Sequence, residues 1–149
     1  MASVQPLTDL TVADLWREVK DERTLWGDVS QQTLRTVKLL LENRMHDELT
    51  DYLNAGRYVR DYGRAGYRNG VYRRRLTTTW GTIPDLQIPR ARDPGFRPSV
   101  VARYQARTEQ VNRLVRAVFL GGLSTRRVGA ALAPLLGETV SPATVSTIT

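Results

Sequence analysis

The fold is decided by residues 71–88, Val71-Tyr72-Arg73-Arg74-Arg75-Leu76-Thr77-Thr78-Thr79-Trp80-Gly81-Thr82-Ile83-Pro84-Asp85-Leu86-Gln87-Ile88. Val71–Trp80 is rich in β-branched and aromatic residues, which favours a strand. Gly81-Thr82 predicts a turn, and Ile83–Ile88 predicts the return strand of a hairpin. Because Pro84 and Pro89 cannot donate a backbone hydrogen bond, this return strand belongs at an edge.

Alternation along the first strand predicts two unlike faces. One face holds Tyr72, Arg74, Leu76 and Thr78, and the other holds Arg73, Arg75, Thr77 and Thr79. The second face is polar and basic, so we expect it to lie against a phosphate backbone.

Helices are predicted before the hairpin. Residues 8–23 predict a first helix capped by Thr11, and Trp26-Gly27-Asp28 predicts a break after it. A longer helix is expected from Ser30 to about Asn54-Ala55-Gly56, with Gly56 as its left-handed cap. Its apolar stripe consists of Leu34, Val37, Leu41, Met45, Leu49 and Tyr52. This stripe can pack inside the chain or against a second copy.

The C-terminal part predicts three more helices. The first runs from Ser99 to Leu120, with a buried stripe of Val111, Leu114, Val115, Val118 and Phe119, and Gly121-Gly122 ends it. Ser124 caps the second, whose apolar face is Val128, Leu132, Leu135 and Leu136 and which Pro134 should kink or shorten. Gly137 permits a reversal, and Ser141-Pro142 begins a last short helix whose Val140, Val145 and Ile148 point to the core.

This order of elements predicts a mostly α fold with a small β-hairpin. It divides into an N-terminal helical pair over 1–56, an Arg-rich hairpin and linker over 57–98, and a truncated helix-turn-helix over 99–149. In a helix-turn-helix the last helix enters the major groove. A plain helical bundle is the alternative.

Charge is distributed unevenly along the 149 residues, whose net charge is +7. Residues 1–54 carry a net charge of −4, whereas residues 55–149 carry +11. Such asymmetry favours a nucleic-acid surface on the second part and assembly on the first. The bias towards arginine, with 20 Arg and two Lys, fits phosphate recognition, but a GC-rich genome accounts for the larger part of it.

The composition excludes several classes of site. The absence of cysteine removes disulfides and thiol chemistry, and a single His46 supplies no histidine-rich metal site. No stretch has the length of a membrane span, and the start carries no secretory signal, so we expect a cytoplasmic, nucleoid-associated protein.

Residues 57–75 interleave seven arginines with four tyrosines, and three glycines make much of this segment a loop. Arginine pairs with phosphates and tyrosine stacks on bases, which indicates a DNA contact; a flexible linker is the alternative. The candidate DNA-binding residues are Arg57, Arg60, Arg64, Arg68, Arg73, Arg74, Arg75, Arg126, Arg127, Ser141, Thr144, Ser146 and Thr147.

The chain resembles the N-terminal part of bacterial insertion-sequence transposases of the Mutator type. The resemblance rests on an ordered set of short motifs: Tyr67-Arg68-Asn69-Gly70-Val71-Tyr72-Arg73-Arg74, Trp80-Gly81-Thr82, Ile88-Pro89-Arg90-Ala91-Arg92, Phe96-Arg97-Pro98, Arg103-Tyr104-Gln105, Gly122-Leu123-Ser124-Thr125-Arg126 and Val140-Ser141-Pro142-Ala143-Thr144-Val145-Ser146. Each motif is weak, but the ordered set over residues 67–149 is specific.

The resemblance implies DNA transposition by an Asp-Asp-Glu triad that uses two Mg²⁺ ions on an RNase H-like domain. That domain follows the residues present here, so we expect no catalytic residue, no bound metal or other cofactor and no enzyme activity in this chain by itself. Asp85, between Pro84 and Leu86, does not fit a triad position. The resemblance implies binding of double-stranded terminal inverted repeats and assembly into a homo-oligomer. A helical oligomerisation module without sequence-specific DNA binding is the alternative.

Overall fold

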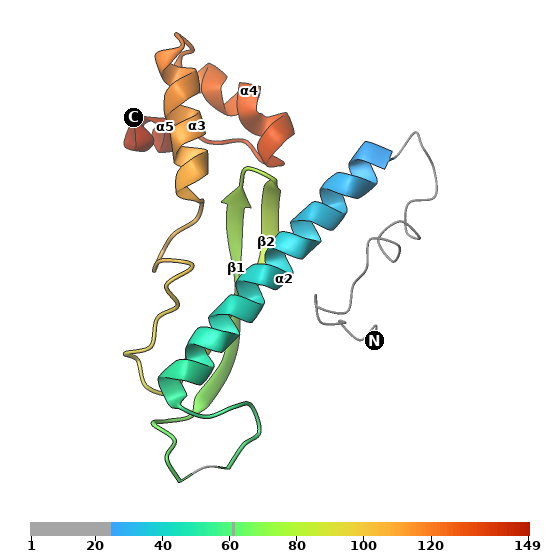
Figure 1. The fold of residues 1–149 in the computed structure, drawn as a ribbon. Coiled ribbons are helices and arrows are strands. Elements are labelled where there is room, and N and C mark those ends of the chain that lie inside the picture. Colours follow the sequence, from blue (N-terminus) through green and yellow to red (C-terminus); the bar gives the residue numbers. More distant parts are fainter. Residues whose placement is uncertain (1–24, 61) are drawn as a thin grey trace.

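A computed structural model describes residues 25–60 and 62–149 of the chain. This part is mostly helical with one antiparallel hairpin, as the sequence predicts, and Figure 1 shows α2 crossing the hairpin while the other helices gather beyond its tip. The elements are α2 (Leu25–Leu53), β1 (Arg68–Thr78), β2 (Gly81–Ala91), α3 (Glu109–Leu120), α4 (Thr125–Leu136) and α5 (Pro142–Ile148). The helix expected over 8–23 lies outside the described residues.

Helix α2 begins at Leu25, so the break expected at Trp26-Gly27-Asp28 and the start at Ser30 are wrong. A glycine inside a helix costs only about 1 kcal/mol relative to alanine, which a helix of 29 residues can absorb. The left-handed residue after the helix is Asn54, with φ 50°, rather than Gly56. Asparagine tolerates this conformation because its short polar side chain can bond locally.

The apolar stripe of α2 packs against the chain's own hairpin. Met45 and Leu49 are fully buried, while Tyr52 at the end of the expected stripe is exposed and Leu53 is buried instead. The cluster around Met45 comprises Leu76, Ile83, Leu86, Ile88 and Val101, with Leu34, Val37, Leu41 and Val100 packed around it. Each fully buried apolar side chain of this size stabilises the fold by about 1.5–3 kcal/mol.

A β-bulge changes the expected alternation of the hairpin. Arg74 pairs with Leu86, but Leu76 pairs with Ile83, so an extra residue of β2 is accommodated at Pro84-Asp85. Because of this bulge, Ile83 and Leu86 both pack in the cluster against α2, although residues three apart on a regular strand face opposite sides.

The outer edge of β1 is covered by the segment that precedes α3. Thr77 accepts from the backbone N–H of Thr108 at 3.0 Å and donates its own N–H to Ala106 at 2.9 Å. The expected helix from Ser99 is therefore wrong over its first ten residues, because this backbone pairs with a strand and α3 begins only at Glu109. Covering an edge strand in this way satisfies polar groups that would otherwise face solvent.

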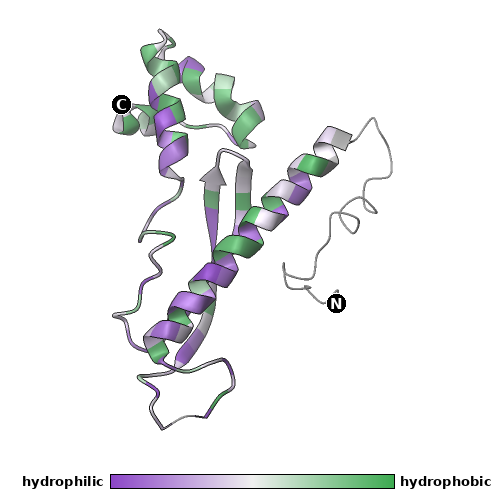
Figure 2. Ribbon diagram, in the orientation of Figure 1, coloured by the Kyte–Doolittle hydropathy of each residue, from purple (hydrophilic) through white to green (hydrophobic). Residues whose placement is uncertain are grey.

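Helices α3, α4 and α5 form a second apolar cluster, and apolar residues recur through all three (Figure 2). The expected core residues Val111, Val115, Val128, Leu132, Leu136, Val140, Val145 and Ile148 are all buried there. Leu135 is 53% exposed, so its place on the buried face is a wrong prediction; Gly129 is buried instead. Gly137 makes the expected left-handed reversal at φ 74°, and α4 ends at Leu136, soon after Pro134.

Candidate nucleic-acid interface

The hydroxyl residues of α5 divide into two groups. Ser141 caps the helix, because its Oγ accepts from the Thr144 N–H at 3.1 Å and donates to Thr144 Oγ1 at 2.9 Å. These two residues therefore fix the start of α5. Ser146 and Thr147 are exposed, and Thr147 donates its hydroxyl to the Ala143 carbonyl at 3.0 Å. The exposed face of α5 is small, uncharged and able to accept hydrogen bonds.

Arg126 and Arg127 lie in the first turn of α4, and both side chains are exposed. Neighbouring Val128 is fully buried, so the helix holds the two arginines outward from a fixed core position. The sequence prediction placed them in this turn, and the structure agrees.

The three consecutive hairpin arginines differ in their surroundings. Arg73 is exposed, whereas Arg74 donates Nη1 to the Ala102 carbonyl at 3.1 Å. Arg75 donates Nη1 to Glu138 Oε2 at 3.1 Å, which ties β1 to the turn after α4. Hydrophilic positions recur along the half of the hairpin away from its tip (Figure 2).

The basic face expected from strand alternation is not open along its whole length. Thr77 is 3% exposed, and its hydroxyl donates to the Glu138 carboxylate. On the same face, the paired residue Thr82 donates Oγ1 to the Leu136 carbonyl at 2.7 Å. The expectation that Thr77 faces a phosphate backbone is therefore wrong, because the end of α4 covers this side of the hairpin tip.

The remaining candidate arginines lie at the opposite end of the hairpin. Arg57 and Arg60 are exposed in the loop after α2, and Arg64 is half-buried. Arg64 donates Nε to the Gly66 carbonyl at 2.6 Å, and Arg68 of β1 donates Nη2 to Thr50 Oγ1 at 2.6 Å. The structure thus splits the sequence-predicted site residues between two ends of the molecule (Figure 1).

His46 of α2 faces the loop arginines. Its pKa is lowered from 6.5, first because burial disfavours the imidazolium and then because Arg57 and Arg68 repel it; Asp47 partly opposes these effects. Burial also lowers the pKa of Arg68, and the charges of Arg57 and Arg64 add to this. These shifts indicate that positive charge is concentrated between α2 and the start of β1.

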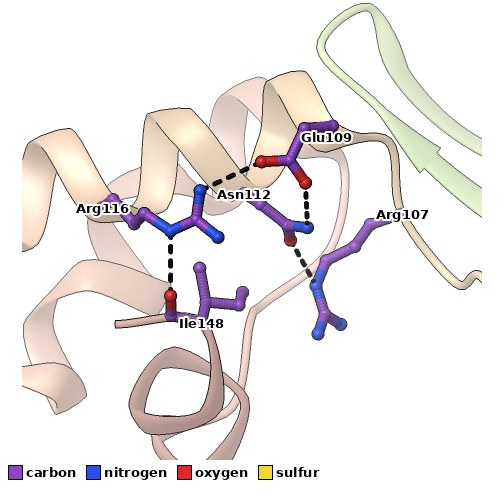
Figure 3. A network of polar contacts seen from close by, with 5 residues as sticks. All are labelled: Arg107, Glu109, Asn112, Arg116 and Ile148. Carbon is purple, nitrogen blue, oxygen red and sulfur yellow. Dashed lines mark hydrogen bonds and ion pairs between the residues drawn. The ribbon is translucent and has the colours of Figure 1, made fainter.

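A polar network at the base of α3 was missed by the sequence reasoning (Figure 3). Arg107 donates Nε to Asn112 Oδ1 at 2.9 Å, and Asn112 donates Nδ2 to Glu109 Oε2 at 3.1 Å. Arg116 donates to Glu109 Oε1 at 3.0 Å and to the Ile148 carbonyl at 2.9 Å. The spacing of Glu109, Asn112 and Arg116 by three and four residues puts them on one helix face and could have revealed the network.

This network orients α5 relative to α3. The Ile148 carbonyl is in the last turn of α5, where carbonyl oxygens lack helical partners and favour a cation. Hydrogen bonds from Asn112 and Arg116 lower the pKa of Glu109, with the charges of Arg116 and Arg113 adding to this.

Several acidic side chains in the described residues take part in ion pairs and hydrogen bonds. Asp85 lies 3.0 Å from Lys38 Nζ, and Glu42 accepts the Gln87 N–H at 2.9 Å. Within residues 25–60 and 62–149, no three acidic or histidine side chains come together as a metal site requires. Over the same residues, no helix has both the length and the apolar character of a membrane span.

Comparison with known proteins identifies the class. A family model described as "Transposase, Mutator family" matches residues 10–149. The chain therefore belongs to the Mutator family of transposases, and the resemblance inferred from its motifs is confirmed.

Individual relatives are insertion-sequence transposases. The chain is 36% identical over 128 residues to the transposase of IS256 in transposon Tn4001 from Staphylococcus aureus, which covers 86% of this chain and 32% of the relative. It is 34% identical over 113 residues to the IS905 transposase of Lactococcus lactis, covering 72% of this chain and 29% of the relative. The ISRM5 transposase of Rhizobium meliloti is 30% identical over 130 residues, covering 87% and 32% respectively. The chain thus spans about a third of the length of these relatives.

Proposed function

We propose that these residues form the DNA-binding and assembly region of an insertion-sequence transposase, which recognises the terminal inverted repeats of its element. The observation that carries the proposal is the unit of α3, α4 and α5. Its last helix starts at a Ser-Pro cap and exposes small hydroxyl residues, in a chain that belongs to a transposase family. We assign α4 and α5 as a helix-turn-helix, with α5 in the major groove.

The exposed arginines and the exposed hydroxyl residues contact different parts of the DNA. Arg126 and Arg127 contact phosphates, because a guanidinium pairs with phosphate oxygens whatever the base sequence. Ser146 and Thr147 lie on the exposed face of α5 and contact base edges, where hydroxyl groups can donate or accept. Arg73 adds a phosphate contact from the hairpin, while Arg74 and Arg75 are already held by contacts within the chain.

Catalysis is assigned to a part of the polypeptide outside the 149 residues. Among the described residues no three acidic or histidine side chains come together, and Asp85 pairs with Lys38 rather than with a second carboxylate. The family relatives are about three times longer, which leaves room for the chemistry elsewhere in the polypeptide.

Assembly is assigned to the exposed face of α2. Trp26, Val29 and Leu40 are 78%, 40% and 55% exposed, and with Thr33 and Thr36 they recur at alternating steps of three and four, which is typical of a helix–helix seam. The hydroxyls of Thr33 and Thr36 donate to carbonyls of their own helix at 2.8 Å, so their donors are already used within α2. A second copy of this chain is the proposed occupant, because two copies of a charge-free stripe meet without repulsion.

Binding of duplex DNA tests the proposal. Fluorescence anisotropy would compare the element's terminal repeat with a scrambled duplex at two salt concentrations. We expect the Arg126→Ala/Arg127→Ala variant to weaken both complexes and to reduce the salt slope by about two, since each lost phosphate contact removes about 0.9. Ser146→Ala/Thr147→Ala should reduce the preference for the repeat. Arg92→Ala/Arg97→Ala removes the same charge from another exposed segment and serves as the control.

Equal binding of both duplexes by the wild type and by all variants would refute the DNA-binding proposal. The assembly proposal is tested separately by sedimentation. Trp26→Ala/Leu40→Ser should shift the protein toward monomer, whereas Leu135→Ser, at a residue of similar exposure on α4, should not.

A further inference from the structure

The loop that joins α2 to β1, described over residues 54–60 and 62–67, is held in a defined shape. The Ala65 N–H donates to the Leu53 carbonyl at 2.8 Å, which anchors the later part of the loop to the end of α2. Arg64 fixes the interior, because it donates Nε to Gly66 at 2.6 Å and Nη1 to Val59 at 3.3 Å. Figure 1 places this connecting loop at the end of the molecule opposite to α3, α4 and α5.

Two tyrosine rings of the connecting loop are stacked on arginine and open to solvent. The Arg57 Cζ lies 5.5 Å from the ring centroid of Tyr58, and the Arg64 Cζ lies 4.6 Å from that of Tyr67. Tyr58 is 92% exposed and Tyr67 is 57% exposed, so each ring retains accessible surface for a further planar group. A guanidinium stacked on one side orients each ring for such a contact.

Tyr58 also has an unfavourable backbone conformation. Its φ of 63° is in the left-handed region, which bulky residues rarely adopt. Residues held in this region often belong to binding sites, because the surrounding structure must maintain them there. Nothing in the core requires the strain, since the side chain of Tyr58 is almost fully exposed.

Beside these rings, the described residues of the connecting loop and β1 bring positive charges together. The Arg68 Nε is a buried donor without a partner in the described part of the chain, and a buried donor without an acceptor is destabilising. Arg57 and Arg64 lie near enough to repel Arg68, and His46 is under the same field. Asp47 is the acid that opposes these charges at His46. An anionic group at this place would neutralise the cluster.

We propose that the connecting loop binds single-stranded DNA. Unpaired bases stack on Tyr58 and Tyr67, and the phosphates between them are held by Arg57 and Arg68. Duplex DNA does not fit, because its bases already stack on each other and leave no free face for a tyrosine ring. Combined aromatic stacking and backbone neutralisation is the usual way in which proteins bind unpaired strands without sequence preference.

The proposal is independent of duplex recognition by α4 and α5. The two surfaces share none of their contact residues, and they lie at opposite ends of the hairpin (Figure 1). A protein with both surfaces can hold the double-stranded part of a DNA end at one place and an opened strand at the other.

The test uses the 149-residue protein and a labelled strand of about 12 nucleotides, within the range that one binding module covers. Its blunt duplex is the second probe. We expect Tyr58→Ala/Tyr67→Ala to lose about tenfold or more in affinity for the single strand, because each stacked base contributes that much in comparable sites. Affinity for the duplex should be unchanged. Tyr58→Phe/Tyr67→Phe keeps the rings and should retain single-strand binding.

Tyr104 provides a matched control. It is 80% exposed, has a φ of 62° and has the Arg103 Cζ 4.8 Å from its ring centroid, but it lies outside the cation cluster. Tyr104→Ala should bind the single strand as the wild type does, and Arg57→Gln should lower the salt slope by about 0.7.

Unchanged single-strand affinity in Tyr58→Ala/Tyr67→Ala, or an equal loss in Tyr104→Ala, would overturn the proposal. Circular dichroism of each variant separates loss of a contact from loss of the fold. If the single strand binds through the connecting loop while no duplex binds, this proposal stands and the function proposed for α4 and α5 fails.

Discussion

The guanidinium of Arg75 lies 3.1 Å from the carboxylate of Glu138, and this contact joins the hairpin to the turn after α4. Thr77 donates its hydroxyl to the other oxygen of the same carboxylate. Thr82 adds a bond of 2.7 Å to the Leu136 carbonyl. Together these contacts set the orientation of the three-helix unit on the hairpin tip.

Glu138 and its ion-pair partner Arg75 should contribute unequally to stability. Glu138→Ala leaves the buried Thr77 hydroxyl without its acceptor, so we expect a loss of about 1–3 kcal/mol. Arg75→Ala should cost less than about 1 kcal/mol, since the Arg75 side chain is 66% exposed and an exposed ion pair contributes little. Urea unfolding of the two variants measures the difference. A larger loss in Arg75→Ala would contradict the assignment.

Gly129→Ala should destabilise the protein although alanine favours helices. A Cβ at this position would lie 2.0 Å from the Val140 carbonyl oxygen, so α4 and the segment before α5 would have to separate. Intrinsic helix propensity alone would stabilise the variant by about 1 kcal/mol. A loss of stability would therefore show that the clash with Val140 outweighs propensity. Thermal unfolding is the measurement. Ala131→Gly, at an exposed position of α4, is the control and should cost about 1 kcal/mol.

Stability should fall in acid partly through Glu109. Hydrogen bonds from Asn112 and Arg116 lower its folded pKa below the ordinary value of 4.5. A lowered carboxyl pKa adds stability that is fully present above about pH 4.5 and is lost as pH falls through the folded pKa. Urea midpoints at pH 7 and pH 3 should show wild type above Glu109→Gln at pH 7 and a smaller difference at pH 3.

Arg116 supplies the cross-check for this pH effect. If the network acts as a unit, Arg116→Ala in the Glu109→Gln background should cost less than Arg116→Ala alone. A gap between wild type and Glu109→Gln that does not change with pH would show that the carboxylate contributes nothing through ionisation.

Met45→Ala should be among the most damaging substitutions in α2. Met45 is fully buried between the helix and the hairpin, and truncation of such a side chain costs about 2–5 kcal/mol. Leu40→Ala on the exposed face should change the free energy of unfolding by no more than about 0.5 kcal/mol. Chemical denaturation at low protein concentration, where assembly does not contribute, measures both. Equal losses would mean that α2 does not pack on the hairpin as described.

The hairpin arginines should contribute unequally to duplex binding. Arg73 is exposed, while Arg74 and Arg75 are engaged with Ala102 and Glu138. We expect Arg73→Ala to reduce the salt slope of binding by about 0.9, the value for one phosphate contact, and Arg75→Ala to change it less. Anisotropy titrations over a range of salt concentrations provide the slopes. The reverse order would indicate that Arg75 leaves Glu138 when DNA binds.

Local periodicity predicted some elements correctly and others not. The hairpin, the core residues of α3 and the Ser141-Pro142 start of α5 follow from the sequence because each depends on residues within one turn or one strand. The start of α3 did not follow, because residues 106–108 pair with Thr77, about thirty residues earlier in the chain.

The candidate site was predicted by residue type but not by arrangement. Counting arginines between residues 57 and 75 suggested one continuous basic segment. The fold instead divides it, since Arg75 pairs with Glu138 at one end and Arg68 joins Thr50 at the other.

What the sequence determined by itself was the hairpin, the approximate places of α2 to α5, the charge asymmetry and the family, because these depend on composition and on spacing along the chain. Only the tertiary structure decided that Thr77 is buried and that the buried Nε of Arg68 has no partner among the described residues. The physical reason is that both outcomes depend on contacts between residues distant in sequence. Such contacts are fixed by how α2 and α4 pack on the hairpin, which no local pattern specifies.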